Sequence, residues 1–157
     1  MIRSAGSSAI DMSDIEIVRL SEDMISAVAH IEAECFAEPW SEKSLKLLLG
    51  EQGFAFAAVA SGTVVAYGGM MCVLDEGQIT NVATLPEFRR MGIGRKIMDA
   101  LEDFAAERGI AMLSLEVRES NIAARKLYAS CGWREEGIRK NFYRRPCENG
   151  IVMTKKL

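Results

Sequence analysis

The chain of 157 residues is 49% hydrophobic and 26% charged, which is typical of one globular domain with a single core. No apolar run approaches the length of a bilayer span, and the N-terminal residues lack the apolar stretch of about 7–15 residues that a signal peptide needs. The sequence therefore predicts a cytoplasmic protein that does not associate with a membrane.

Net charge is −3, but the charges are unevenly distributed along the chain. Residues 1–88 carry 13 acidic and 4 basic residues, whereas residues 89–157 carry 9 acidic and 15 basic residues. This asymmetry suggests an anionic ligand for the second half and a cationic partner for the first. A patchwork of solvated faces is the alternative interpretation.

The four cysteines are too widely separated for a typical metal site, and the chain has one histidine, His30. Free cysteine is among the residue types most often buried. We therefore predict reduced, mostly buried thiols and no bound metal. The cysteines concerned are Cys35, Cys72, Cys131 and Cys147.

Residues 1–13 are rich in Ser, Gly and Ala without periodicity, which predicts a disordered leader before one domain over residues 14–157. The domain begins with a predicted strand at 15–20. A helix follows from an N-cap at Ser21 to about Phe36. Ser41 is predicted to cap a second, short helix that ends at Gly50.

Residues 54–60, a Ser61-Gly62 turn and residues 63–72 are typical of a β-hairpin, and residues 77–85 of a further strand. The pair Gly68-Gly69 indicates a bulge or a close backbone approach.

After Pro86, apolar residues at helical spacing predict a helix that ends at Gly109. A strand at 111–117, a helix capped by Ser120 and closed by Gly132, and a terminal antiparallel pair complete the chain. The predicted order βααβββαβαββ indicates an α/β fold with a mixed sheet.

The sequence RRMGIGRK, residues 89–96, brings four cations and two glycines to the start of the helix after Pro86. It is not a dinucleotide fingerprint, because the third glycine would fall at Ile97, and it lacks the Gly-Lys-Ser/Thr of a P-loop. The free amides and dipole of a helix start favour an anion such as pyrophosphate. A capped helix with a solvated basic start is the alternative.

The turn RRMGIG also fits the R/Q-x-x-G-x-G/A pattern with which GNAT N-acetyltransferases hold the pyrophosphate of acetyl-coenzyme A. LEVRESNIAARKLY, residues 115–128, resembles a more specific motif of the protein N-terminal acetyltransferases in this family. EPWSEKSL, residues 38–45, resembles its bacterial ribosomal-protein-alanine N-acetyltransferases (RimI type). The resemblance covers residues 15–157 and implies a GNAT-like fold with a mixed, mostly antiparallel sheet flanked by helices.

The resemblance implies acetyl-coenzyme A as the co-substrate. The glycine turn is then expected to bind the pyrophosphate, and the end of strand 77–85 to pair its backbone with the pantetheine arm and polarise the thioester. An asparagine in the second motif is expected to contact the coenzyme. The positions concerned are Val82, Ala83, Thr84, Arg90, Met91, Gly92, Ile93, Gly94, Arg95 and Asn121.

Glu116 alternates with apolar neighbours in the segment LSLEV, so we predict its side chain on the non-core face of the strand. A carboxylate there can take a proton from an ammonium group and release the amine as a nucleophile. The resemblance makes Glu116 the general base. A merely solvated glutamate is the alternative.

Asn121 and Tyr128 are seven residues apart, which places them within about 20° on one helix face. Ala123, Leu127 and Cys131 are predicted on another face, which packs on the sheet. The resemblance implies that Tyr128 is the general acid for the coenzyme A thiolate. A buried core tyrosine is the alternative.

Trp40 and Tyr143 are the expected contacts of the acceptor. The chain departs from the family pattern at Leu85 and Thr84, and at Asn149-Gly150 in the hairpin that shapes the family's peptide groove. These departures affect the expected acceptor sequence more than the expected reaction.

The resemblance thus implies acetylation of a protein N-terminal amine, that of a ribosomal protein beginning with alanine. The charge asymmetry adds that this protein is expected to be basic, and no direct nucleic-acid contact is expected. The amine is expected to attack the thioester directly in a ternary complex, without a cysteine nucleophile. A lysine or small-amine acetyltransferase is the alternative enzyme. The alternative outside enzymes is an acyl-coenzyme A binding module, which would need neither Glu116 nor Tyr128.

Overall fold

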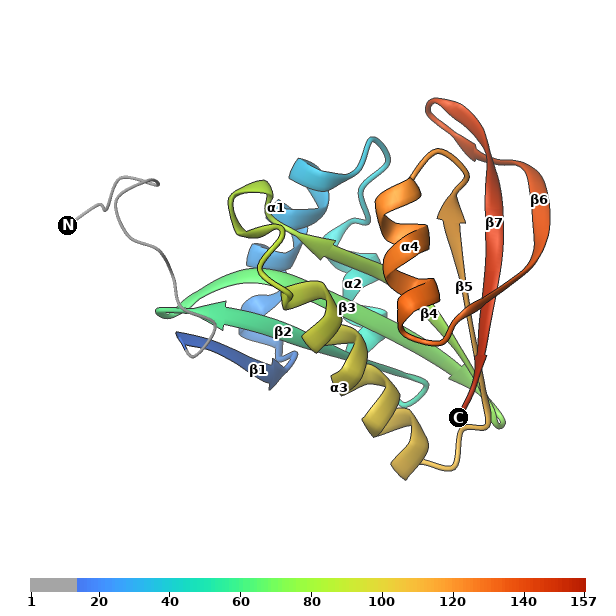
Figure 1. Ribbon diagram of the computed structural model, residues 1–157. Helices are drawn as coiled ribbons and strands as arrows, with labels where there is room; N and C mark the ends of the chain where they lie inside the picture. The colour runs from blue at the N-terminus through green and yellow to red at the C-terminus, as the bar shows by residue number, and fades with distance from the viewer. Residues whose placement is uncertain (1–13) are drawn as a thin grey trace.

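The computed structural model describes residues 14–157, and the leader predicted at residues 1–13 lies outside them. In the described part, seven strands form one sheet in the order β1-β2-β3-β4-β5-β7-β6 (Figure 1). All neighbours are antiparallel except β4 and β5. The strands are β1 (Ile15–Arg19), β2 (Gly53–Ala60), β3 (Thr63–Val73), β4 (Glu76–Thr84), β5 (Met112–Arg118), β6 (Arg134–Arg144) and β7 (Cys147–Lys156).

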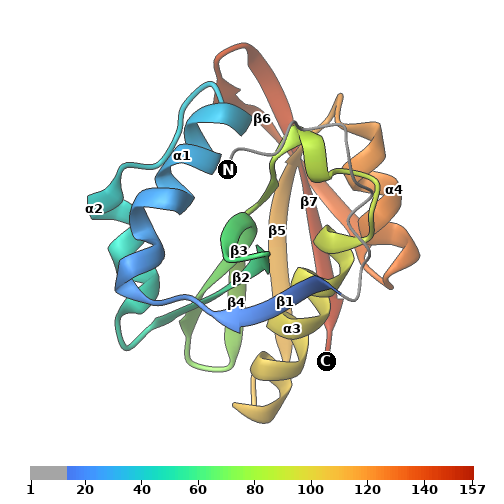
Figure 2. The same ribbon diagram turned by 90° about the vertical axis from the view of Figure 1, so that its left-hand side faces the viewer.

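Helices cover both faces of the sheet: α1 and α2 lie on one face, and α3 and α4 on the other (Figure 2). The helices are α1 (Ile25–Cys35), α2 (Glu42–Leu45), α3 (Ile93–Glu107) and α4 (Ile122–Ser130), with short 3₁₀ turns at Glu22–Met24, Lys46–Leu49 and Pro86–Phe88. The predicted fold class, the predicted element order and the GNAT-like architecture are confirmed. No helix within residues 14–157 is long and apolar enough to span a bilayer.

Each face of the sheet buries its own apolar cluster. Towards α3, the helical stripe Ile93, Ile97 and Leu101 packs with the inward residues of β5. Towards α1, Val28 and Ile31 pack with residues of α2, β2 and β3. The buried residues alternate along the strands and recur every three or four residues along the helices. The same periodicity in the sequence predicted the strands and helices.

The Gly68-Gly69 pair is both a bulge and a close approach, as predicted. The register of β3 with β4 shifts between Gly68 and Met70, where Thr80 and Asn81 of β4 oppose one residue. A Cβ on Gly68 would lie 2.5 Å from Cγ2 of Ile97. The glycine thus lets α3 lie directly on the sheet.

β4 and β5 separate part-way along their length. They pair only at Glu76–Gln78 with Met112–Ser114, after which β5 continues against β7 alone. Figure 1 shows the two strands diverging towards the end at which α3 begins. In residues 14–157 the later half of β4 has no strand partner on this side, and its backbone groups therefore face an opening.

Several local predictions need correction. Ser21 precedes a 3₁₀ turn and its hydroxyl bonds to the Asp23 side chain, so it does not cap α1. The N-cap of α4 is Asn121, whose Oδ1 accepts from the Ala124 amide at 3.1 Å, and not Ser120. Ser41 does cap α2, by accepting from the Ser44 amide.

The faces of α4 also differ from the prediction. Ala123 is exposed, and the helix packs on the core through Ala124 and Tyr128 together with the predicted Cys131. These three positions follow the i, i+4, i+7 spacing of one helix stripe. The prediction of mostly buried cysteines was wrong, since three are half-buried and Cys147 is exposed. All four are free thiols.

Candidate active site

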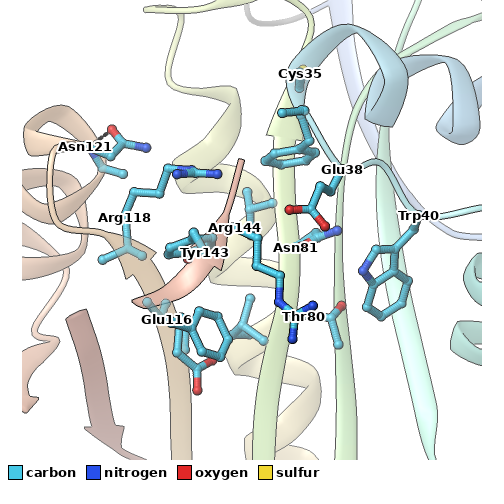
Figure 3. A pocket seen from close by; sticks show the side chains of 18 of the residues that line it. Cys35, Glu38, Trp40, Thr80, Asn81, Glu116, Arg118, Asn121, Tyr143 and Arg144 are labelled. Carbon is cyan, nitrogen blue, oxygen red and sulfur yellow. Dashed lines mark hydrogen bonds between the residues drawn. The ribbon is translucent and has the colours of Figure 1, made fainter. Parts of the chain in front are cut away.

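A cavity of about 750 Å³ occupies the opening between β4 and β5. Its walls come from the α1–α2 loop, β4, β5, the start of α4 and the β6–β7 hairpin (Figure 3). Six predicted site residues line it together: Trp40, Val82, Glu116, Asn121, Tyr128 and Tyr143. In Figure 3, Glu38 and Trp40 lie on the opposite side of the cavity from Arg118 and Asn121.

Glu116 lies on the face of β5 away from α3, as predicted, but its side chain is only 10% exposed. Its Oε2 accepts from Nε2 of Gln78 at 3.0 Å, and its Oε1 lies 3.4 Å from Nε of Arg139. Neither partner was identified from the sequence. A carboxylate so enclosed is held in one orientation while keeping lone pairs free for an amine or a water.

Tyr128 and Tyr143 lie on different walls of the cavity, and both phenols resist ionisation. Burial raises the pKa of Tyr128 to about 12, with a further contribution from Tyr143. Burial also raises the pKa of Tyr143 to about 12, and the Glu116 carboxylate adds to the effect. Both hydroxyls therefore remain hydrogen-bond donors at neutral pH. Tyr128 also packs against Trp133, with 6.1 Å between the ring centroids.

The predicted coenzyme residues of the glycine turn lie at or just before the start of α3, outside the cavity lining. Gly92 is the N-cap with φ of +79°, and Arg90 also has a left-handed φ of +64°. Arg95 is exposed. Met91 packs on the core, and the side chain of Ile93 is buried.

The predicted coenzyme residues at the end of β4 differ in what they leave available to a ligand. The Ala83 side chain is buried, so only its backbone is available to a ligand. The carbonyl of Thr84 already accepts from Nε of Arg89 at 3.0 Å and from Sγ of Cys35 at 3.4 Å.

Glu32, which the sequence did not single out, is a fully buried carboxylate next to the cavity wall formed by the α1–α2 loop and β4. It accepts from the amide of Trp40 at 2.8 Å, from the hydroxyl of Tyr67 at 2.5 Å and from Nδ2 of Asn81 at 2.9 Å. Three donors from separate segments satisfy this buried charge. They join α1 to the loop that carries Trp40 and to the bulge of β4.

Arg118, two residues beyond Glu116, joins β5 to the β6–β7 turn. Its guanidinium donates to the carbonyls of Arg145 at 2.9 Å and Pro146 at 3.0 Å, and to Oε1 of Glu148 at 3.1 Å. The same group lies 4.4 Å from the ring centroid of Tyr143. Glu148 accepts a second bond from the amide of Ser120, just before α4.

The hydrogen bonds from Ser120, and the Arg118 guanidinium beside them, lower the pKa of Glu148 from its usual value. A carboxyl with a lowered folded-state pKa stabilises the fold above its unfolded pKa of about 4.3, and this contribution is lost as pH falls through the folded value. We therefore expect Glu148→Gln to cost stability at pH 6 and progressively less towards pH 3. Urea unfolding of both proteins across this range measures the difference. A difference that does not change with pH would contradict the prediction.

Within residues 14–157, no group of three or more His, Cys, Asp or Glu side chains is placed to hold a metal ion.

The acetyltransferase (GNAT) family model matches residues 25–133. The chain belongs to the GNAT family of acetyltransferases. Enzymes of this family use acetyl-coenzyme A as the acetyl donor, and the chain is accordingly an acetyl-coenzyme A-dependent N-acetyltransferase.

Within this family, the chain is similar to enzymes named as ribosomal-protein-alanine N-acetyltransferases. The chain is 41% identical to the [ribosomal protein bS18]-alanine N-acetyltransferase of Escherichia coli strain K12, over 76% of this chain and 80% of that protein. It is 36% identical to the Haemophilus influenzae protein of the same name, over 78% and 86% of the two chains.

Solved structures share the fold over nearly the whole chain. The crystal structure of the ribosomal-protein-S18-alanine N-acetyltransferase from Escherichia coli matches with a TM-score of 0.84 and 38% identity, covering 90% of this chain and 93% of that one. The structure of Ard1 from Thermoplasma volcanium also gives a TM-score of 0.84 at 24% identity, covering 92% and 98%. The latter likeness concerns the fold alone.

Proposed function

We propose that the chain acetylates the N-terminal alanine of a ribosomal protein of the S18 type. The observation that carries this proposal is the 41% identity to an enzyme named for that reaction, over most of both chains. The cavity agrees with it, because a carboxylate, two phenols and an aromatic side chain line one space that opens beside the unpaired half of β4. A lysine or small-amine acceptor and an acyl-coenzyme A binding module without turnover are the alternatives.

The residues fit the coenzyme at two places. At the start of α3, a Cβ on Gly94 would meet only Cδ2 of Leu127, at 3.9 Å, so space for a phosphate lies over the first free amides. Arg90, Arg95 and Lys96 are exposed around it. At the β4–β5 opening, Val82 pairs with β3 and has no strand partner on the β5 side, where the pantetheine arm could pair with it. Because the side-chain oxygen of Asn121 caps α4, its amide nitrogen is the atom left for the coenzyme.

Acetyl-coenzyme A supplies an electrophilic thioester carbonyl, which the amine attacks so that a C–N bond forms and the C–S bond breaks. Glu116 takes the proton that the ammonium group loses. Because the pKa of Tyr128 is about 12, above that of an ordinary thiol, the phenol acts first as a hydrogen-bond donor to the departing sulfur. A proton that it gives up to the sulfur returns to it from solvent.

The proposed acceptor is tested by intact-mass analysis of a peptide panel with acetyl-coenzyme A. One peptide begins with a free alanine and lacks lysine, a second has a blocked N-terminus and one lysine, and a third has both amines. We expect an increase of one acetyl group on the first and third peptides alone. Acetylation of the blocked peptide would favour a lysine acceptor, and no acetylation of any peptide would favour the binding module.

Acidic side chains at the rim of the cavity are expected to attract a basic acceptor. Glu38 lines the cavity, and Glu42 is exposed nearby at the start of α2. Reversing both to lysine should raise the KM for a basic peptide beginning with alanine about three- to tenfold at low salt, since exposed pairs contribute about 0.2–1 kcal/mol each. The KM for acetyl-coenzyme A should stay nearly constant.

The matched control reverses Glu51 and Glu76, which are exposed and outside the cavity lining, and so makes the same change in net charge. Initial rates at two salt concentrations measure the effect. Identical peptide kinetics for the parent and the Glu38/Glu42 variant at low salt would show that these acids serve solubility alone.

A further inference from the structure

Arg118 of β5 contacts the β6–β7 turn, and through Glu148 it is also linked to the start of α4. Its side chain, 27% exposed, makes two hydrogen bonds to the β6–β7 turn and one to Glu148 of β7, and it covers the ring of Tyr143. In residues 14–157, no other arginine makes hydrogen bonds to two successive backbone carbonyls. Since it lies on the same strand face as Glu116, it sets the hairpin directly against the strand that carries the proposed base.

The segment held by Arg118 forms one wall of the cavity. Residues 142–146 all line the cavity, facing the loop that carries Glu38 and Trp40. β6 is otherwise exposed along nearly its whole length and lies at the edge of the sheet, with β7 as its one strand neighbour. In addition, its register with β7 shifts between Arg139 and Tyr143. Beyond the shift, Tyr143 pairs with Glu148 and Arg144 with Cys147, so the end of the hairpin forms a short ladder of its own. The contacts of Arg118 tie this end of the hairpin to β5.

We propose that Arg118 is a positioning residue that holds Tyr143 and the β6–β7 turn in place for the acceptor peptide. The inference rests on the proposed function, because it assigns this wall to the acceptor. Glu148 extends the same contacts to the start of α4, since one oxygen pairs with Arg118 and the other accepts from the Ser120 amide. The wall that meets the peptide is thereby fixed relative to the helix that carries Asn121 and Tyr128.

The role requires the shape of arginine as well as its charge. A planar guanidinium with five N–H donors reaches several acceptors at once and stacks on an aromatic ring, whereas a lysine ammonium acts as a point charge. Arg118→Lys therefore keeps the charge near Glu116 and removes most of the contacts to the turn. A defect in this variant reports the geometry of the wall and not a change of electrostatic potential.

We expect Arg118→Lys to raise the KM for an alanine peptide at least about tenfold, as the loss of one to two hydrogen bonds to a charged donor implies. The KM for acetyl-coenzyme A should change less than twofold, because none of the lost contacts is made at the start of α3. The matched control is Arg125→Lys. This variant also removes a bidentate arginine–carboxylate pair, because Arg125 donates to the two oxygens of Glu135 at 2.9 and 3.1 Å. Arg125 lies outside the cavity lining. Its two KM values should equal those of the parent.

A double variant tests whether Arg118 acts through the ring that it covers. Tyr143→Ala should raise the peptide KM by itself, and Arg118→Lys should then add less than it does in the parent, because the two changes remove a shared contact. Glu148→Gln should raise the same KM to a smaller extent. It provides the second measurement if Arg118→Lys does not fold.

An unchanged peptide KM in Arg118→Lys, or equal changes in both KM values, would overturn the inference. Fully additive effects of the Arg118 and Tyr143 changes would overturn it as well. These results differ from failure of the proposed function, in which the parental protein itself leaves the alanine peptide unmodified. Parental acetylation of that peptide, together with an unaffected Arg118→Lys variant, would remove the role of Arg118 alone.

Discussion

Glu116→Gln is expected to lower kcat about 10²- to 10⁴-fold at neutral pH, the range in which positioned acid–base groups contribute to rate. The amide has nearly the same shape and can still accept from Gln78, so the cavity should keep its form. It cannot take a proton from the acceptor ammonium. The defect should therefore shrink above the amine's own pKa of about 8, where the free amine predominates.

The measurement is a pH profile of peptide acetylation for the parent and the variant, with coenzyme affinity determined in parallel. Parental affinity for acetyl-coenzyme A would show that the variant is folded and that the loss lies in turnover. Near-normal rates across the profile would exclude Glu116 from proton transfer and leave its hydrogen bond to Gln78 as a structural feature.

Gly94→Leu is expected to weaken acetyl-coenzyme A binding about 10- to 100-fold while the protein stays folded. The first part follows because the new side chain would occupy the space over the helix amides, and each lost hydrogen bond to a charged group is worth about 1.5–3 kcal/mol. The second part follows because a Cβ at this position meets no atom closer than 3.9 Å. Isothermal calorimetry with acetyl-coenzyme A measures the loss.

Gly92 is the less suitable position for the same experiment. Its φ of +79° would strain any other residue by about 1–2 kcal/mol, so lost binding could not be separated from lost stability. The control for Gly94→Leu is Gly137→Leu on β6. A Cβ at Gly137 meets no atom within 4 Å, and the residue lies outside the cavity lining. Equal affinities of the Gly94 and Gly137 variants would place the pyrophosphate elsewhere.

The order of the elements could be predicted because it depends on local signals. Alternation along β5, helical spacing from Ile93 to Leu101, and the turns at Ser61-Gly62 and Gly92 each lie within a few neighbouring residues. The resemblance to a family added which of these segments would meet around one cavity. Six of the predicted site residues do meet there.

The contacts that hold the site together could not be predicted in this way. Glu32 bonds to Asn81 across 49 positions, Gln78 to Glu116 across 38, and Arg118 to Glu148 across 30. No periodicity relates residues so far apart, and a glutamate on a helix is usually exposed. The shift of the α4 cap from Ser120 to Asn121 has a different origin. Both side chains can cap a helix, and the sequence alone does not decide between two adjacent capping residues.

The buried carboxylate of Glu32 also limits how the acceptor preference of this protein could be redesigned. It accepts the backbone amide of Trp40, so the path of the loop, and not only its side chains, is fixed from the interior. A loop transplanted from a relative with a different path would leave Oε1 of Glu32 without its donor, while Oε2 keeps Tyr67 and Asn81. Such a lost partner on a buried group costs about 1–3 kcal/mol. Changes of the side chains at positions 38 and 40 keep that amide in place. Under the proposed function, point substitution at the rim is therefore the route to a new acceptor specificity, and loop exchange would have to include replacement of Glu32 itself.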